Sequence, residues 1–331
     1  MAKHHTVQDK YLAQWKKTET DNQLNIYVIP ENKIIERGPR WKGFWREDFN
    51  MLDEGEKPYL PEDVTALIDT KGIDAIRKID PLKQEQLTGM DRSCVAFYVA
   101  LQYIRTPRHR EEVDKLIEAQ TQYFMSKDLS APEKMGLTKE KVLEHIPQND
   151  YEKKALEQVK GMTQEEINKQ LFDTISNKEY HVELTNAGHS KGILKVDRFA
   201  KKVFEIQWLF LIAPQGSSFI TSDNPCFTIA PGKIMNGLLS PLATVIFPLR
   251  PDICVYIRPG KISKVEHYMR LNRKEVRDIN AIILSNSYQC AVAKDQAHLE
   301  HLVKGYDHAN HRKSRDVAVS ESGDYVMFNV E

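Results

Sequence analysis

The sequence has few cysteines and no excess of charge of either sign. Its 331 residues include four widely spaced cysteines: Cys94, Cys226, Cys254 and Cys290. This spacing excludes a zinc ribbon and a compact disulfide framework, so we expect buried thiols. Lys and Arg together number 47, as do Asp and Glu, and the formal net charge is zero. Because the chain carries no overall positive field, any binding of nucleic acid must be local.

Long hydrophobic runs are also missing. The longest apolar run, Trp208 to Ala213, is far too short to cross a bilayer. The first residues, Met1 to His5, lack the apolar core of a signal peptide. With 41% hydrophobic and 28% charged residues, the composition is that of a globular protein, neither disordered nor fibrous. We therefore expect a cytoplasmic protein that has no membrane partner.

Several widespread catalytic signatures are absent as well. The sequence has no Gly-x-Gly-x-x-Gly, no phosphate loop ending in Gly-Lys-Ser/Thr, no His-Glu-x-x-His and no Gly-x-Ser-x-Gly. These absences argue against dinucleotide oxidoreductases, kinases, zincins and ordinary esterases. Any reaction must be sought in less familiar groups of residues.

The pattern of the residues that are present changes along the chain. Residues 1–60 form an aromatic-rich arm, which holds three of the tryptophans and one short strand. Large aromatic side chains must be buried, so we expect this arm to wrap onto the body of the protein. Residues 61–185 form a helical region, because apolar residues recur at three- and four-residue steps, most clearly from Pro61 to Ser176.

The last region, residues 186–331, has a different texture. Short runs rich in Val, Ile and Phe alternate with Pro, Gly, Asn and Asp turn signals, which is typical of antiparallel sheet. A helix from about Asn272 to Ser287 is expected after them, with Asn272 as its cap. The sequence therefore predicts an α+β fold, in which a helical N-terminal part packs on a mostly antiparallel C-terminal sheet with helices. We expect the three regions to form one composite domain.

An Arg-Thr-Pro element joins a buried helix to an exposed one. The helix from about Asp91 to Ile104 is apolar nearly all round, which predicts a central buried position. Thr106 suits the cap of the next helix and Pro107 its first position. The unpaired amides at this helix start would favour a phosphate or a carboxylate.

Three arginines flank this helix start. Arg105 emerges directly from the buried helix and is our best candidate for holding a phosphate, with Arg110 as a second and Arg108 beside them. The alternative is that these arginines pair with Glu111, Glu112 or acidic groups elsewhere, as surface arginines often do.

A second polar element follows a strand at Phe219 to Pro225. Asp223 lies at the strand end, where a side chain can point into a cleft, and it could ligate a metal or serve as a base. Ser222 or Asn224 would orient it. The alternative is that Asp223 and Asn224 only bond their own backbone and shape the turn.

Three further residues complete the set of candidates. His4 and His5 are adjacent, and imidazole can transfer protons near neutral pH or bind a metal. The alternative for both is a solvent-exposed terminal position. Asn280 lies on the apolar face of the helix from Asn272 to Ser287, where it either braces the neighbouring sheet or faces a cleft.

Taken in order, these elements resemble the family called domain of unknown function 4238. The resemblance covers most of the chain and rests on these segments: His4-His5 followed by Tyr11-Leu12 and a tryptophan, Gln102 to Arg110, Phe219 to Pro225, Phe247-Pro248-Leu249, and Asn280. The chain departs from the family pattern at Thr6 to Asp9 and at the early helical glutamates, which Glu62 and Asp69 represent. The resemblance implies site residues without implying a reaction.

We expect these distant segments to meet around one anionic ligand. The first functional hypothesis is a metal-dependent hydrolase of a phosphate-containing substrate, with a nuclease as the favoured subtype. In it Arg105 and Arg110 hold phosphate, Asp223 binds Mg²⁺ or Mn²⁺ or activates water, and His4 or His5 transfers a proton.

The second hypothesis is a noncatalytic regulatory or defence-associated module. The same groups, with Asn224 and Asn280 also contacting the ligand, would then recognise an anion, a nucleotide or nucleic acid.

Overall fold

The computed structural model describes residues 3–18, 20–52, 59–128, 138–147, 149–177, 186–230, 237–238, 240, 242–311, 315–319 and 325–328. The chain forms two compact units. The first comprises Met1–Val113, Leu184–Asp316 and Val326–Glu331, and the second comprises Asp114–Glu183 and Val317–Tyr325. Residues on both sides of position 60 thus belong to the first unit, which also holds all the candidate site residues. The predicted organisation into three regions stays a prediction.

The first unit contains most of the helices. They are α1 (Asp9–Leu12), α2 (Leu60–Arg77), α3 (Gly89–Ile104), the start of α4 (Pro107–Asp128), α8 (Asn186–Leu194), α9 (Val196–Glu205), α10 (Arg273–Ser285) and α11 (Gln296–Val303). Short 3₁₀ turns join some of them to strands: η1 (Ala13–Trp15), η2 (Ile29–Glu31) and η3 (Lys42–Phe44).

The strands of this unit form three sheets. The strands are β1 (Lys3–His5), β2 (Leu24–Val28), β3 (Lys33–Arg37), β4 (Trp45–Glu47), β5 (Ile206–Ile212), β6 (Thr221–Ser222), β7 (Phe227–Ile229), β8 (Thr244–Arg250), β9 (Ile253–Ile262), β10 (Glu266–Arg270) and β11 (Cys290–Ala293). Their orders are β10-β5-β9-β8-β7, β3-β2-β11-β6 and β1-β4. Only the β10-β5 pair is parallel among these described strands. The predicted α+β fold, with a mostly antiparallel sheet and helices, is confirmed.

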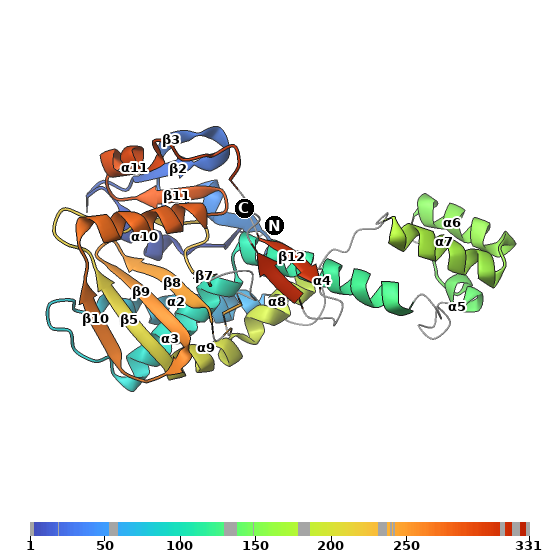
Figure 1. The fold of residues 1–331 in the computed structure, drawn as a ribbon, viewed down its shortest axis with the longest axis horizontal. Helices are drawn as coiled ribbons and strands as arrows, with labels where there is room; N and C mark the ends of the chain where they lie inside the picture. The colour runs from blue at the N-terminus through green and yellow to red at the C-terminus, as the bar shows by residue number, and fades with distance from the viewer. Residues whose placement is uncertain are drawn as a thin grey trace. The chain divides into compact units, whose positions relative to one another are not determined.

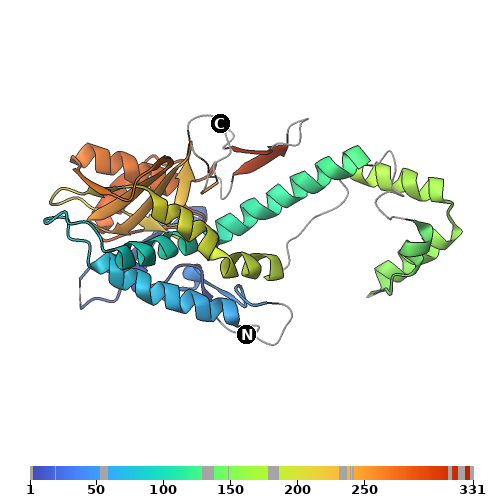
Figure 2. The same cartoon turned by 90° about the horizontal axis from the view of Figure 1, so that it is seen from below.

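The five-stranded sheet is covered by helices on both faces (Figure 1, Figure 2). Along β8, Val245 and Phe247 belong to the core cluster that contains α2, α3 and α9 residues, whereas Ile246 belongs to the cluster that contains α10 residues. This alternation follows from the two-residue period of a strand. α3 lies in the first of these cores, as its apolar circumference predicts.

The N-terminal arm is built into this structure. β2 lies inside the four-stranded sheet, between β3 and β11. Trp15 is fully buried, and its indole N–H donates to the Phe219 carbonyl at 2.8 Å. The expectation that the arm packs on the body is thereby confirmed.

The helices of the second unit are the remainder of α4, α5 (Lys139–Leu143), α6 (Asp150–Gly161) and α7 (Gln164–Ser176). Near the end of the chain, β12 (Asp316–Val319) pairs with β13 (Tyr325–Phe328). Among the helices in the described ranges, none combines the length and the apolar character that a bilayer span requires.

Helices α2 and α3 approach each other closely in the first unit. A Cβ added at Gly72 of α2 would lie 2.5 Å from the Cβ of Tyr98 on α3. Only glycine therefore allows this spacing. It brings the buried polar side chains of the two helices within hydrogen-bond distance of each other.

Replacing Gly72 by alanine should destabilise the protein. Alanine is favoured over glycine inside a helix by about 1 kcal/mol, but the clash with Tyr98 should outweigh this and cost about 1–3 kcal/mol net. Urea unfolding followed by circular dichroism measures the change. Gly89→Ala is the control, because a Cβ there has no atom within 4 Å in the described structure. Equal stability of the two variants would contradict the close approach.

Candidate functional site

His4 is buried in a two-stranded antiparallel sheet near the N-terminus. Strand β1 pairs with β4, and His4 stands directly opposite Arg46. The Nδ1 atom of His4 accepts a hydrogen bond from the Asn50 backbone N–H at 2.8 Å. Because Nδ1 accepts, the ring proton lies on Nε2, which is buried and has no partner in the described part of the chain. His4 therefore presents a free N–H donor.

This tautomer bears on the predicted metal role of His4. A histidine that ligates a metal through one nitrogen usually donates a hydrogen bond from the other. In His4 the second nitrogen accepts instead. The geometry thus suits His4 to hydrogen-bond donation. Among the described residues, no group of three or more His, Cys, Asp or Glu side chains is arranged to hold a metal ion.

Asn50 connects His4 to Glu62 on α2. Its side-chain Nδ2 donates to Glu62 at 2.9 Å, while its Oδ1 is buried without a partner in the described chain. Glu62 and Asp69 are seven positions apart, so they share one face of α2.

Asp69 has two differently placed oxygens. Oδ2 accepts from Arg105 at 2.8 Å, whereas Oδ1 is buried and has no partner within the ranges described. Burial raises the pKa of Asp69, and Glu62 adds to this, although Arg105 and His5 act in the opposite direction. Such a carboxylate holds a proton more readily than an ordinary aspartate.

Arg105 is fully buried at the end of α3. Besides its ion pair with Asp69, its Nε donates to the side-chain carbonyl of Gln102 at 3.3 Å. Tyr98 lies one turn further back, and its hydroxyl donates to Gln8 at 3.1 Å. The sequence left two roles open for Arg105, pairing with an acidic residue or holding a phosphate. The structure gives it Asp69 as an acidic partner, and phosphate binding stays a prediction.

The Arg-Thr-Pro element and the Ser-Asp-Asn-Pro element touch each other. The Thr106 hydroxyl accepts from the His109 N–H, as a helix cap does, and donates to Asn224 Oδ1 at 3.2 Å. Asn224 Nδ2 in turn donates to the Asn286 carbonyl at 2.8 Å. Segments that lie far apart in sequence therefore meet, as the convergence hypothesis requires.

Asp223 is committed to backbone groups. Its two oxygens accept from the N–H groups of Tyr288 at 2.9 Å and Gln289 at 2.7 Å. Burial raises the pKa of Asp223 to about 6, against the lowering effect of these N–H groups and of Arg46. Asp223 thus clamps the turn that leads into β11, rather than its own turn. Its roles as metal ligand or base stay predictions.

Asn280 is also engaged. Its Oδ1 accepts from the Ile220 N–H at 3.0 Å and its Nδ2 donates to the Ser218 carbonyl at 2.9 Å. It braces the segment before β6, which is one of the two roles that the sequence left open. Ligand binding by Asn280 and Asn224 stays a prediction.

Arg110 lies beside a second buried histidine. Its guanidinium is 5.4 Å from the centre of the Phe49 ring, which itself lies 4.6 Å from the ring of His189 on α8. Burial, together with the smaller effects of His109 and Arg110, lowers the pKa of His189 to about 3. Phe49 precedes Asn50, so Arg110 and His189 adjoin the His4 region.

Unsatisfied polar atoms gather in this part of the first unit. Within the described residues, the buried atoms without a hydrogen-bond partner include His4 Nε2, His5 Nδ1, Thr6 Oγ1, Asn50 Oδ1, Asp69 Oδ1 and His189 Nε2. We call His4, His5, Asn50, Glu62, Asp69 and Arg105 the N-terminal polar network. Buried polar atoms are normally bonded, so this concentration marks a place for a polar ligand or ordered water.

Asp69, Arg46 and His189 are not among the site residues that the sequence predicts. Asp69 had a detectable signal, since a carboxylate stands in the apolar stripe between Ile68 and Ile73 of α2. Arg46 and His189 had no such signal, because only the pairing of β1 with β4 and the position of α8 bring them near His4 and Phe49.

The sequence profile of a family described as "Protein of unknown function (DUF4238)" matches residues 3–297. The chain belongs to this family. Searches of curated proteins and of solved structures found no match. In this DUF4238 chain the matched range contains the whole N-terminal polar network, the Arg-Thr-Pro element and Asp223, and it ends before Arg315.

Arg315 lies beyond the matched range in sequence and pairs with Glu112 near the start of α4. Glu112 accepts from Arg108 at 3.1 Å and from Arg315 at 2.6 Å, and all three side chains are buried. Burial acts to raise the pKa of Glu112, but Arg315 and Arg108 outweigh it and lower the pKa to about 2. The space between these residues is only about 10 Å³, so the cluster is filled and rigid.

Glu112→Gln should destabilise the first unit in a pH-dependent way. The variant leaves two buried guanidinium groups without their carboxylate, which should cost about 3–5 kcal/mol near pH 7. Because the folded pKa of Glu112, about 2, lies below the ordinary value of 4.5, its stabilisation is complete above pH 4.5 and is lost as pH falls toward 2. Urea unfolding from pH 7 downward measures the difference from wild type, which should narrow below pH 4.5.

Glu85→Gln, at an exposed residue of the same unit, is the control. Its free energy of unfolding should equal that of wild type at every pH. A Glu112→Gln difference that stays constant from pH 7 to pH 3 would contradict the ionic role of Glu112.

Proposed function

We propose that this protein is a hydrolase of a phosphate-containing substrate and that the N-terminal polar network holds its reacting groups. The observation that carries the proposal is the state of Asp69. One of its oxygens is held by Arg105, and the other is buried without a partner in the described chain, near His5. A general base needs a fixed carboxylate with one free oxygen.

The roles follow from the hydrogen-bonding capacity of each group. Asp69 Oδ1 takes a proton from a water molecule, and the water oxygen forms a bond to phosphorus. The bond from phosphorus to the leaving oxygen then breaks, and His5 supplies the proton that this oxygen takes up. His4 donates its Nε2–H to a phosphate oxygen. The raised pKa of Asp69 supports proton acceptance closer to neutral pH than an ordinary aspartate allows.

Nearby arginines support an anionic substrate. Arg46 stands opposite His4 in the two-stranded sheet, and its guanidinium donates to the backbone carbonyls of Lys42 and Trp45. Arg110 adds positive charge beside Phe49. Arg105 is a positioning residue in this proposal, because Asp69 and Gln102 already engage its guanidinium. Two further cations next to the network favour phosphate over a neutral substrate.

A nuclease is the finer form of the proposal. The zero net charge of the chain favours a substrate that is held locally by these arginines. Mg²⁺ or Mn²⁺ at Asp223 stays part of the hypothesis and is therefore included as a variable in the assay.

Asp69→Asn should abolish most of the turnover. Loss of a general base typically lowers a rate by about 10²–10⁴-fold. The assay incubates the full-length protein with RNA, single- and double-stranded DNA and nucleotides, with and without Mg²⁺ or Mn²⁺, and measures the products by chromatography. His5→Gln should also lower the rate, and the pH profile of the wild type should show a rising limb above the usual aspartate range.

Asp63→Asn is the matched control, because Asp63 is an exposed aspartate of the same helix. It should keep wild-type turnover. Equal product from wild type and Asp69→Asn would reject the assignment, as would full loss in Asp63→Asn. Arg105→Ala and Asp223→Ala, checked first for folding, test the two roles predicted from sequence.

A noncatalytic module that binds an anion or a nucleotide is the second candidate. The observation in its favour is that Arg105 and Asp223 are held by intramolecular bonds, as in a rigid binding site. Thermal stabilisation by a ligand from the same panel, without turnover under any of the metal conditions, would favour this candidate over the hydrolase.

A further inference from the structure

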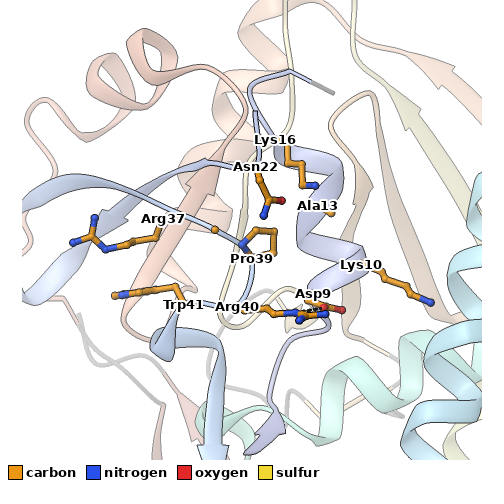
Figure 3. Close-up of a pocket in the computed structure, with 10 residues that line it drawn as sticks. Asp9, Lys10, Ala13, Lys16, Asn22, Arg37, Pro39, Arg40 and Trp41 are labelled. Carbon is orange, nitrogen blue, oxygen red and sulfur yellow. Dashed lines mark hydrogen bonds and ion pairs between the residues drawn. The ribbon is translucent and has the colours of Figure 1, made fainter. Parts of the chain in front are cut away.

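A separate open pocket lies on the first unit, away from the residues of the N-terminal polar network. It has a volume of about 580 Å³ and is formed by the α1–η1 segment and by the loop that follows β3 (Figure 3). Lys10 and Lys16 come from the first segment, and Arg37, Arg40 and Trp41 from the second. Volumes of roughly 300–1,000 Å³ are typical of small-molecule sites.

The lining of this pocket is strongly cationic. The four basic side chains share the lining with one carboxylate, Asp9, which already pairs with Arg40 at 3.0 Å, while Lys10 and Arg37 extend to opposite sides (Figure 3). Lys10, Lys16 and Arg37 form no ion pair with a carboxylate within the described ranges. The chain as a whole carries 47 basic and 47 acidic residues, so this excess is a local feature. It creates a potential that attracts an anion of several charges.

Trp41 gives the pocket a flat aromatic wall. Its ring packs against Gly43, where an added Cβ would lie 2.0 Å from a ring atom, and it meets Phe44 edge-on at 5.6 Å. These contacts hold the indole in place while it also lines the pocket. A rigid aromatic ring beside several cations is the combination that binds a base together with its phosphates.

We propose that this pocket binds a nucleotide carrying several phosphates. The positive side chains of the lining draw the phosphates into the pocket, and the base lies against Trp41. Arginine and lysine both pair with phosphate oxygens, and the salt bridge to Asp9 holds Arg40 back from full engagement. None of the lining residues belongs to the N-terminal polar network, so this inference does not rest on the hydrolase proposal.

Isothermal titration calorimetry of the full chain with ATP, inorganic triphosphate and adenosine tests the assignment. ATP should bind more tightly than either of its parts. The double change Lys10→Gln with Arg37→Gln should weaken ATP binding about tenfold, since two of the positive charges that line the pocket are lost. Raising the salt concentration from about 0.15 M to about 0.5 M should weaken binding too, because these charges are exposed to solvent.

Asp9→Asn provides a test that misfolding cannot imitate. It removes the carboxylate that pairs with Arg40, whose side chain is 83% exposed, and should tighten ATP binding several-fold. Lys71→Gln, an exposed lysine of α2, is the control and should leave the dissociation constant unchanged. Asp69 does not line this pocket, so Asp69→Asn should bind ATP at the pocket with the wild-type dissociation constant. The hydrolase proposal and the nucleotide-pocket proposal can therefore fail independently of each other.

Two results would overturn the inference. The first is an ATP dissociation constant that neither the double variant nor Asp9→Asn alters. The second is equal affinity for ATP and inorganic triphosphate, which would show that the base does not contribute to binding.

Discussion

The buried ion pair between Arg105 and Asp69 is the interaction around which the first unit is organised. Removing a guanidinium group from water costs several kcal/mol unless its donors are bonded. Arg105 meets this requirement through Asp69 and Gln102, and it can reach Asp69 only because α2 and α3 lie close together at Gly72. The pair thus fixes both helices and the point at which α4 begins.

Two buried carboxylates near this point behave in opposite ways for a physical reason. Glu112 faces two guanidinium groups, which lower its pKa to about 2. Asp69 faces one, and burial prevails, so its pKa is raised. The first arrangement stabilises a closed and filled cluster. The second leaves Asp69 Oδ1 buried without a partner in the described chain, which lowers stability. Such a loss of stability is expected at a ligand-binding site.

The chain also shows how a protein without net charge can attract anions. Positive side chains gather in two places, at Arg46 and Arg110 beside the N-terminal polar network and in the pocket lined by Lys10 and Arg37. The first pair is half-buried and adjoins a buried network, so it suits chemistry on a bound group. The second is open and faces solvent, so it suits reversible binding.

Local patterns in the sequence determined a large part of this picture. The apolar circumference of α3, the cap at Thr106, the burial of Trp15 and the α+β class all follow from neighbouring residues, because periodicity and capping act over a few positions. The same local motifs carried the resemblance to the DUF4238 family, which the match to residues 3–297 confirms.

Tertiary structure alone decided which of these residues meet. Arg46 stands opposite His4, Thr106 bonds to Asn224, and Asp223 receives the N–H groups of the turn before β11. Each contact joins segments far apart in sequence, and the pKa of Asp69 or Asp223 depends on burial by all of them together. A side chain's chemical type is written in the sequence, but its partners and its solvation exist only once the distant segments have packed.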